Sequence, residues 1–473
     1  MNKREFLKLM GQSMILVGLP WTKSSAEMGP KGPSGGPLNL LFVTVDDMNG
    51  DSPGWMGNPL RLTPNLDAFA ATANRMVNNH AAAPICQPSR EAMMTGLVPH
   101  RSGGLGFDPV HEGTPTLTTL LQAAGYFAVA INKEEHMQPE SCFPWDLKFK
   151  KSGKNPEVIG EQLSEAIRAA QSAKKPFFIN CNITDPHRPF FPGSRKEDGE
   201  VGSLDWPLEA NEVKVPSFLE DLPPIREEVA KYYSSVKRLD LSFGSIIHAL
   251  EASGEADRTV VLFVADHGMS FPFAKATVYA NGTWTPAVLR VPGMDKSRTF
   301  EELTCSTDIM PTLLDALHIA KPQGLDGRSW LPLFAGEKQP DRDFVISNVN
   351  SVSSGKQFPQ RCVQTLKRAL IFSPWSDGNT KFHVEAMSGH SFKAMDEAAK
   401  GNPKLKSRVD QYIFGYPMAF YDLEKDPDQR VNLIADPNYK SEVAAIQKTL
   451  LAYMERTGDP QLDNLKAALS RCC

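Results

Sequence analysis

Carboxylates follow directly after two short apolar runs of the sequence. Asp46 and Asp47 end the run LNLLFVTV, and Asp266 and His267 end the run TVVLFVA. Adjacent carboxylates at one site repel each other unless a cation neutralises them. Three hard oxygen donors favour a divalent cation; Ca²⁺ fits best because it accepts many oxygens in loose geometry, and the nitrogen of His267 keeps Mn²⁺ open beside Mg²⁺. An isolated Asp-Asp pair after a strand would instead be an N-cap or an Asx turn.

Basic and imidazole side chains occur near the ends of two further apolar runs. Lys133 and His136 follow GYFAVAI, and His187 follows PFFINCNI. Lysine and arginine bind tetrahedral oxyanions, and histidine can donate a proton to a leaving oxygen near neutral pH. Each of these residues alone is usually a solvated surface group. Together with Arg90 and Lys275 they favour a site for an anion such as sulfate or phosphate.

The four apolar runs alternate with segments of helical periodicity. This alternation predicts βαβ units and an α/β fold with a large, mainly parallel central sheet covered by helices on both faces. Apolar residues recur at helical spacing in TPTLTTLLQAAG, PEVIGEQLSEAIRAAQSA and IREEVAKYYSSVKRLDLSFGSIIHALEASG. Ligands bind outside the carboxyl ends of the strands in open α/β sheets, so the four polar run ends should meet at one crevice.

A change of pattern predicts the domains. The sheet-forming pattern spans residues 38–338, and residues 339–473 show short β-like runs and a final helix from about Lys440 to Glu455. These features predict a small C-terminal α+β subdomain. Residues 192–224 are rich in Pro, Glu, Asp and Trp without clear periodicity, and they form either a rim of the crevice or an inert insertion.

The N-terminus has the order of an export signal. Residues 1–26 begin with basic residues, continue with an apolar stretch and stop at small residues, and residues 27–37 form a Gly/Pro/Ser linker. We therefore expect a protein exported to the periplasm or secreted. The segment KREFLK also resembles the bacterial twin-arginine pattern with Lys3 in place of the first arginine. A buried N-terminal helix is the alternative, and no later run is long enough to cross a bilayer.

Composition and cysteine count limit the function further. The 473 residues are 41% hydrophobic and 22% charged, and their net charge of −4 excludes the overall basic footprint of nucleic-acid-binding proteins. An anionic substrate must therefore be held locally. Seven cysteines are an odd number in an oxidising compartment, so at least one sulfur is unpaired or chemically committed, and Cys86 is the candidate.

The sequence around Cys86 carries a specific resemblance. CQPSR followed by EAMMTG resembles the signature of the type I, formylglycine-dependent sulfatases of the alkaline phosphatase superfamily. The matching residues are Cys86, Pro88, Ser89, Arg90, Thr95 and Gly96. VTVDD, TPNLDAFA, DPHRP, ADHG, DIMPTLLDAL and FYDLEKDPDQRVNL are similar to other sulfatase blocks in the same order, and DPHRPF, YYSSVKRLDLSFG and FPQRCVQT look most like the heparan N-sulfatase (sulfamidase) branch. The resemblance implies an alkaline phosphatase-like fold.

The resemblance also implies a role for each candidate residue. Cys86 would be oxidised after synthesis to formylglycine by a formylglycine-generating or an anaerobic sulfatase-maturating enzyme. One hydroxyl of the hydrated aldehyde would attack sulfur, and the other would later expel sulfate by re-forming the carbonyl. Arg90 would steady the hydrate, and His136 would assist it. The implied sulfate-binding residues are Lys133, His187 and Lys275. The implied metal ligands are Asp46, Asp47, Cys86, Asp266 and His267.

The implied function is hydrolysis of a sulfate ester, or a sulfamate, of a carbohydrate such as a sulfated polysaccharide or a glycosaminoglycan fragment. Two departures from the family pattern leave alternatives open. NKEEH separates Lys133 from His136 by one residue more than the family's KWH or KKH, and the position of His267 is commonly Asn, although His occurs in related phosphonate monoester hydrolases. A phosphonate monoester or phosphodiester hydrolase is therefore the second interpretation. A non-catalytic binder of sulfated glycans is the third, which the intact Cys86 and Arg90 disfavour.

Overall fold

The structure is a computed structural model that describes residues 36–294, 297–340 and 342–470. The predicted export signal lies outside the described residues, as does all but the end of the predicted linker. Within the described part of the chain, no helix is both long enough and apolar enough to cross a membrane.

The larger of two sheets contains the four strands that the apolar runs predict. Its strands are β1 (Asn39–Val45), β2 (Asn74–His80), β3 (Phe127–Ile131), β4 (Leu147–Phe149), β5 (Phe177–Ile183), β6 (Thr259–Ala265), β7 (Trp284–Arg290) and β8 (Thr299–Cys305). They lie in the order β4-β3-β5-β1-β6-β7-β2-β8. The predicted strands β3, β5, β1 and β6 are direct neighbours and all run parallel, whereas β7 is antiparallel to both of its neighbours. The carboxyl ends of β3, β5, β1 and β6 therefore meet at one edge of the sheet.

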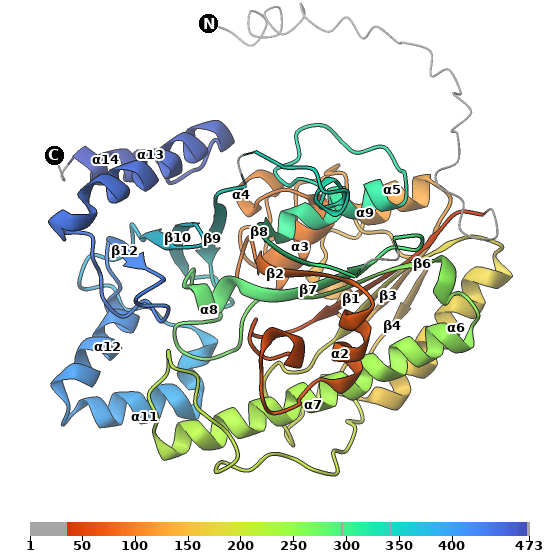
Figure 1. The fold of residues 1–473 in the computed structure, drawn as a ribbon, viewed down its shortest axis with the longest axis horizontal. Helices are drawn as coiled ribbons and strands as arrows, with labels where there is room; N and C mark the ends of the chain where they lie inside the picture. Colours follow the sequence, from red (N-terminus) through yellow and green to blue (C-terminus); the bar gives the residue numbers. More distant parts are fainter. Residues whose placement is uncertain (1–35, 295–296, 341, 471–473) are drawn as a thin grey trace, which may run out of the picture.

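Helices cover both faces of this sheet. They are α2 (Pro64–Ala71), α3 (Cys86–Thr95), α4 (Pro99–Ser102), α5 (Leu117–Ala123), α6 (Pro156–Ser172), α7 (Pro223–Ala252), α8 (Ala280–Thr283), α9 (Ile309–Ala316) and α10 (Leu331–Phe334). In Figure 1, α2, α6 and α7 lie on one side of the sheet and α3, α5 and α9 on the other.

The side chains of β1 alternate between two hydrophobic cores. Leu41 and Val43 share a core with residues of α6 and α7, whereas Leu40 and Phe42 share a second core with residues of α5 and α9. A strand buried on both faces needs a nearly continuous apolar run, which explains why the sequence shows no polar alternation here. The predicted fold class, an α/β fold with helices on both faces of a mainly parallel sheet, is confirmed.

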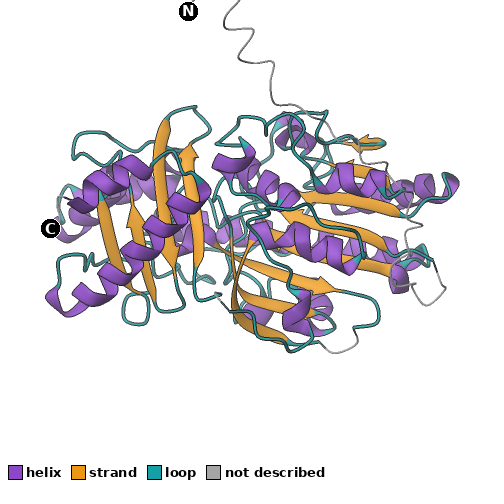
Figure 2. Ribbon diagram, turned by 90° about the horizontal axis from the view of Figure 1, so that it is seen from above, coloured by secondary structure: helices purple, strands orange, loops and turns teal. Residues whose placement is uncertain are grey.

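A second, antiparallel sheet follows in the chain and lies beside the first (Figure 2). Its strands are β9 (Val345–Ser351), β10 (Gln357–Gln364), β11 (Arg368–Phe372) and β12 (Met418–Asp422), in the order β12-β11-β10-β9. The accompanying helices are α11 (His390–Ala399), α12 (Pro403–Phe414), α13 (Lys440–Thr457) and α14 (Leu462–Ser470). We call β9 through α14 the C-terminal region. The predicted boundary at residue 339 stays a prediction.

The end of the chain differs from the expectation in one element. The helix expected from Lys440 to Glu455 corresponds to α13, but it is not the final helix, because α14 follows it. Gly458 is left-handed (φ 64°) and ends α13 as glycine does after many helices. In α14, Leu465 is fully buried, and Leu462 and Leu469 pack partly buried against the same hydrophobic core.

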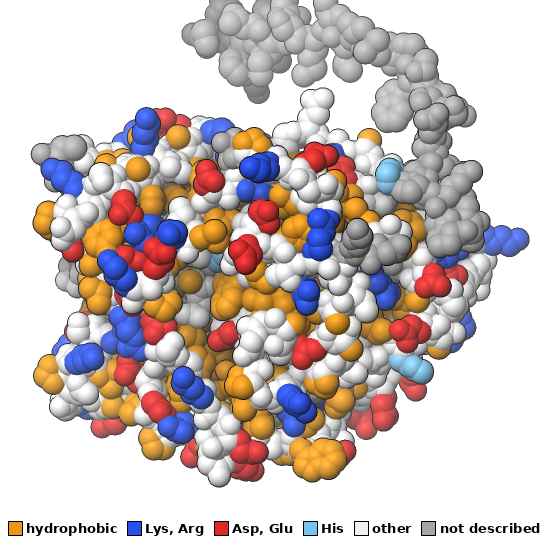
Figure 3. Space-filling view, viewed as in Figure 1, with side chains coloured by type: hydrophobic (Ala, Val, Ile, Leu, Met, Phe, Trp, Pro, Cys, Tyr) orange, Lys and Arg blue, Asp and Glu red, His pale blue; other side chains and the backbone are white. Residues whose placement is uncertain are grey.

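Charges of both signs are interspersed on the molecular face seen in Figure 3. Lys, Arg, Asp and Glu side chains alternate over this face without a broad region of one sign. This distribution agrees with the small net charge of −4.

A buried ion pair ties α7 to the loop after β5. Arg238 donates from Nε and Nη2 to the two carboxylate oxygens of Asp185, at 2.6 and 3.0 Å, and both side chains are 0% exposed. Asp185 lies two residues before His187, so this pair fixes the start of the loop that carries a candidate site residue. A bidentate arginine-carboxylate pair gives this position a defined geometry.

We expect Arg238→Met to destabilise the fold strongly, because it leaves the Asp185 carboxylate buried without its partner. The free energy of unfolding, measured by urea denaturation, should fall by about 3–5 kcal/mol. Arg226→Met is the matched control, since Arg226 forms an exposed pair with Asp221 on the first turn of the same helix and should cost less than about 1 kcal/mol. Equal losses in the two variants would contradict the structural role given to Arg238.

Candidate active site

The ends of β1 and β6 bring three candidate carboxylates together. Val45 and Ala265 are register partners in these parallel strands, so Asp46 and Asp266 follow them side by side. The backbone N–H of Asp47 donates to Asp266 Oδ1 at 3.0 Å, and the N–H of His267 donates to the same oxygen at 2.8 Å. Asp47 adopts a left-handed conformation (φ 58°), which turns the chain sharply after the strand.

Three basic side chains from separate elements compensate these carboxylates. Arg90 on α3 pairs with Asp46 and lies 3.4 Å from Asp266 Oδ2. Lys133 Nζ, after β3, lies 2.7 Å from Asp46 Oδ2. Lys275 Nζ donates to both oxygens of Asp47, at 2.9 and 3.0 Å. The predicted basic residues therefore meet the predicted carboxylates.

The two adjacent aspartates respond differently to burial and charge. Burial favours the neutral form of Asp46, but Lys133 and Arg90 outweigh it and hold the pKa of this carboxyl well below its usual range. For Asp47, burial is the stronger effect and raises the pKa above its ordinary value despite Lys275. Lys133, Lys275 and Arg90 therefore do not fully offset the cost of burying the ionised carboxylates of this site.

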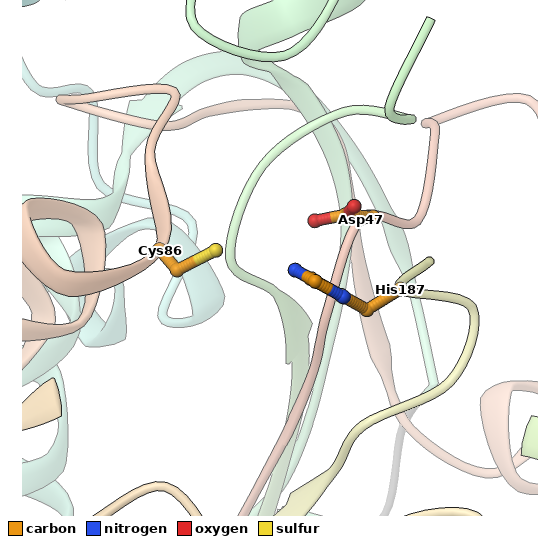
Figure 4. Close-up of side chains that lie close together, drawn as sticks. All are labelled: Asp47, Cys86 and His187. Atoms are coloured by element: carbon orange, nitrogen blue, oxygen red, sulfur yellow. The ribbon is translucent and has the colours of Figure 1, made fainter. Parts of the chain in front are cut away.

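Cys86 is the first residue of α3 and faces this cluster. The thiol is 3% exposed, and its Sγ lies 3.3 Å from His267 Nε2. Ligand-type atoms of Asp47, Cys86 and His187 lie within 4.8 Å of one another, as do those of Cys86, Asp266 and His267. Figure 4 shows the side chains of Asp47, Cys86 and His187 converging on one point. The next turn of α3 fixes this helix end, because Ser89 Oγ donates to the Asp266 carbonyl at 2.6 Å.

The donor set fits a divalent cation. Asp266 Oδ2 is buried and receives no hydrogen bond. The Nδ1 of His267 lies 3.0 Å from the Gly268 carbonyl, which can only accept, so Nδ1 carries a proton and Nε2, which faces Cys86 Sγ, is the nitrogen that could bind a metal. Burial disfavours a charge on His267, but Asp266, Cys86 and Asp47 raise its pKa to about 10. These surroundings stabilise a positive charge at this position, and the carboxylate oxygens are ligands that Ca²⁺ and Mg²⁺ accept.

The cluster opens into a cavity of about 660 Å³. The predicted site residues that line it are Cys86, Lys133, His136, His187 and Lys275. The Nδ1 of His187 lies 2.7 Å from the Arg188 carbonyl, so this nitrogen also carries the proton and Nε2 is the acceptor. Burial, with Lys275 second, holds the pKa of His187 well below its usual value. Burial, with Lys133 second, likewise holds the pKa of His136 well below its usual value.

Four cavity residues carry no motif that sequence reasoning could have recognised: Phe107, Arg195, Glu197 and Glu385. Phe107 is 44% exposed and meets the His136 ring edge to face at 5.7 Å. Arg195 and Glu197 belong to the segment 192–224, so this part of it is a rim of the cavity rather than an inert insertion. Glu385 comes from the C-terminal region. Its place in the cavity could be predicted only by knowing which segments, distant in the sequence, lie together in the fold.

A family model described as Sulfatase matches residues 38–319. The chain belongs to the sulfatase family. The predicted class of enzyme, a sulfuric ester hydrolase, is therefore confirmed at the level of the family.

Known relatives span nearly the whole chain. N-sulphoglucosamine sulphohydrolase of Homo sapiens is 26% identical over 90% of this chain and 91% of its own length. An ulvan-active sulfatase of Formosa agariphila is 25% identical over 90% of this chain and 82% of its own.

Solved structures share the fold at lower identity. One, in complex with its substrate D-glucosamine-2-N,6-O-disulfate, has a TM-score of 0.67 at 17% identity and covers 90% of this chain and 99% of its own. A phosphonate monoester hydrolase of Silicibacter pomeroyi has a TM-score of 0.64 at 18% identity and covers 90% and 96%.

A buried carboxyl group stabilises α3 behind Cys86. Glu91 is 0% exposed, and its Oε1 accepts from Gln87 Nε2 at 3.1 Å. Burial raises the pKa of Glu91 to about 8. Because the folded pKa lies above the unfolded value of 4.5, Glu91 is protonated at neutral pH, and its contribution to stability declines as the pH rises towards 8.

Glu91→Gln should remove this pH dependence. Between pH 6 and pH 9 the free energy of unfolding of the unmodified protein should fall by about 3 kcal/mol relative to the variant, because the buried carboxyl must ionise. Urea denaturation across this range measures the difference. Glu157→Gln, at an exposed position in the first turn of α6, controls for the loss of one negative charge. A difference that stays constant with pH would contradict the raised pKa.

Proposed function

We propose that the protein hydrolyses a sulfate ester, or a sulfamate, of a carbohydrate such as a sulfated polysaccharide or glycosaminoglycan fragment. One observation carries the proposal: Cys86, Asp47 and His187 converge within 4.8 Å at the base of a cavity lined by further basic residues. The names of the human and Formosa agariphila relatives support a sulfated carbohydrate as substrate. In this proposal Cys86 is converted to formylglycine by a maturating enzyme, and its hydrate is the nucleophile.

Lys133, Lys275 and His187 bind the sulfate group in the proposed mechanism. Both lysines line the cavity while their ammonium groups contact Asp46 or Asp47. An ammonium group has three donors, so Lys133, which contacts one oxygen of Asp46, can still donate to a sulfate oxygen, and Lys275 adds positive charge beside it. These donors offset the negative charge that develops on sulfate oxygens during transfer.

The proposed metal ligands are Asp46, Asp47, Asp266 and His267, together with the modified Cys86. A bound divalent cation, with Ca²⁺ proposed and Mg²⁺ or Mn²⁺ as alternatives, would promote ionisation of the attacking hydroxyl and offset charge on the sulfate. Arg90 contacts Asp46 and Asp266 and holds them in place beneath the nucleophile.

His187 and His136 manage protons in the proposed reaction. With Nδ1 of His187 held by the Arg188 carbonyl, Nε2 is left to exchange a proton with an oxygen in the cavity. His136 Nδ1 is buried without a hydrogen-bond partner, and it can therefore accept from the hydrate at Cys86. The low pKa of both rings keeps them neutral until an anion binds.

The predicted export signal extends the proposal to location. We propose an exported protein, periplasmic or secreted, which would meet extracellular polysaccharides. Removal of residues 1–26 should then retain the protein in the cytoplasm of a bacterial host, as fractionation would show.

We expect Cys86 to be an aldehyde in active protein. Peptide mass spectrometry of protein coexpressed with a formylglycine-generating enzyme should show a mass loss matching thiol-to-aldehyde conversion in the tryptic peptide that ends at Arg90. Cys86→Ala is the control for the assignment, and it should lower kcat/KM for 4-nitrophenyl sulfate by at least about 10³-fold because the nucleophile is absent.

Three outcomes would overturn parts of this proposal. An unmodified thiol in fully active protein would exclude the aldehyde mechanism. A higher kcat/KM for a phenylphosphonate monoester than for 4-nitrophenyl sulfate would favour the phosphonate hydrolase alternative, which shares the fold. Glycan binding without any turnover would favour the non-catalytic binder.

Asp266→Asn should weaken metal binding, because it removes the charge of a buried oxygen that accepts no hydrogen bond in the protein. We expect the affinity for Ca²⁺, measured by isothermal titration calorimetry on chelator-treated protein, to fall at least about tenfold. Glu197→Gln removes a charge from the cavity wall instead and should leave the affinity within about twofold. Equal Ca²⁺ affinities for Asp266→Asn and the unmodified protein would contradict the proposed ligand set.

A further inference from the structure

The C-terminal region contributes an acidic side chain to the cavity that the proposed mechanism does not use. Glu385 begins the short helix η6 (Glu385–Ser388) and lines the cavity together with Cys86. Its Oε2 lies 3.2 Å from Lys275 Nζ and 4.0 Å from His187 Nε2, and its Oε1 lies 3.2 Å from Arg195 Nη2. A carboxylate at this place is unexpected in a pocket for an anion, because it repels negative charge.

Glu385 is ionised and partly open to the cavity. Lys275 is the main cause that lowers the pKa of Glu385 below its usual range, and burial acts in the opposite direction. The side chain keeps 30% of its surface exposed. Its charge can therefore act on a molecule bound in the cavity.

Pairing with Lys275 does not account for this carboxylate by itself. Lys275 already contacts both oxygens of Asp47. An ionised carboxylate accepts up to about four hydrogen bonds, and the two basic groups at 3.2 Å, Lys275 and Arg195, occupy only part of that capacity. The remaining acceptor sites suit hydrogen-bond donors of a bound molecule.

The position of Glu385 is fixed by a second carboxylate. Glu228 on α7 accepts from the backbone N–H groups of His390 and Ser391, at 3.1 and 2.7 Å, just after η6. The same carboxylate pairs with Arg188, at 2.6 Å, directly after His187. Glu228 thus connects the segment of Glu385 to the loop of His187, so the two cavity residues are held relative to each other.

We propose that Glu385 is a specificity-determining residue for the sugar that bears the scissile sulfate. It accepts hydrogen bonds from a free hydroxyl or amine close to that sulfate and rejects substrates that carry a second sulfate or a carboxylate there. The geometry supports this because Glu385 approaches both Lys275 and His187, two of the residues proposed to hold the sulfate. The inference rests on the proposed function.

Binding to the full-length Cys86→Ala protein tests this inference without turnover. The probes are D-glucosamine 2-N-sulfate, 3-O-sulfate and 6-O-sulfate, followed by derivatives of the tightest binder with a second sulfate at each free hydroxyl. By isothermal titration calorimetry, we expect the monosulfate to bind at least about tenfold more tightly than one of the disulfates. Adding Glu385→Gln should reduce this ratio of monosulfate to disulfate affinity at least about fivefold, because the repulsion between the carboxylate and the second sulfate is removed.

Two further variants control the measurement. Glu197→Gln removes another cavity carboxylate, for which no contact with Lys275 is found, and should leave the ratio within about twofold. Glu385→Asp keeps the charge and should preserve a preference for the monosulfate even if Glu385→Gln folds poorly. An unchanged ratio in Glu385→Gln, no preference in Glu385→Asp, or no binding of any monosulfate would overturn the inference.

Turnover by the unmodified protein separates this inference from the proposed function. If matured protein hydrolyses no sulfate ester while selectivity in binding still depends on Glu385, the proposed hydrolysis fails and the specificity role stands. If it hydrolyses a sulfated sugar but Glu385→Gln leaves selectivity unchanged, the specificity role fails alone.

Discussion

The burial of three carboxylates at the ends of two neighbouring strands is the constraint on which the rest of the site depends. Asp46, Asp47 and Asp266 are each 0% exposed, so water cannot relieve their mutual repulsion. Arg90 and the two cavity lysines must reach them from separate elements. This requirement explains why α3 begins at the end of the sheet, with all ten of its residues buried.

The lysines connect the carboxylate cluster with the cavity. Lys133 and Lys275 each bind an aspartate on one side and face the cavity on the other. A substitution at either lysine therefore changes both the balance of buried charge and the affinity for an anion. For this reason the loss of activity in such a variant would not by itself separate binding from the integrity of the cluster, whereas Glu385 lies outside the cluster and can be tested on selectivity alone.

The sequence predicted the part of the site that depends on strand ends. β1, β3, β5 and β6 are largely apolar runs followed by polar residues, and parallel pairing brings such ends together without detailed knowledge of packing. β2 was missed because NRMVNNH is largely polar. Glu385 was missed for a different reason: its place in the cavity depends on long-range contacts through Glu228, which leave no local pattern.

Residues near strand ends and residues placed by long-range contacts form two different parts of the cavity. The charged end, proposed to hold the sulfate, is built from residues that follow strand ends of the main sheet and from the start of α3. The other end, proposed to face the sugar, includes Phe107, Arg195 and Glu385, which come from loops and from the C-terminal region. Loops tolerate substitution better than paired strands do, so the sugar end can change while the charged end stays constant.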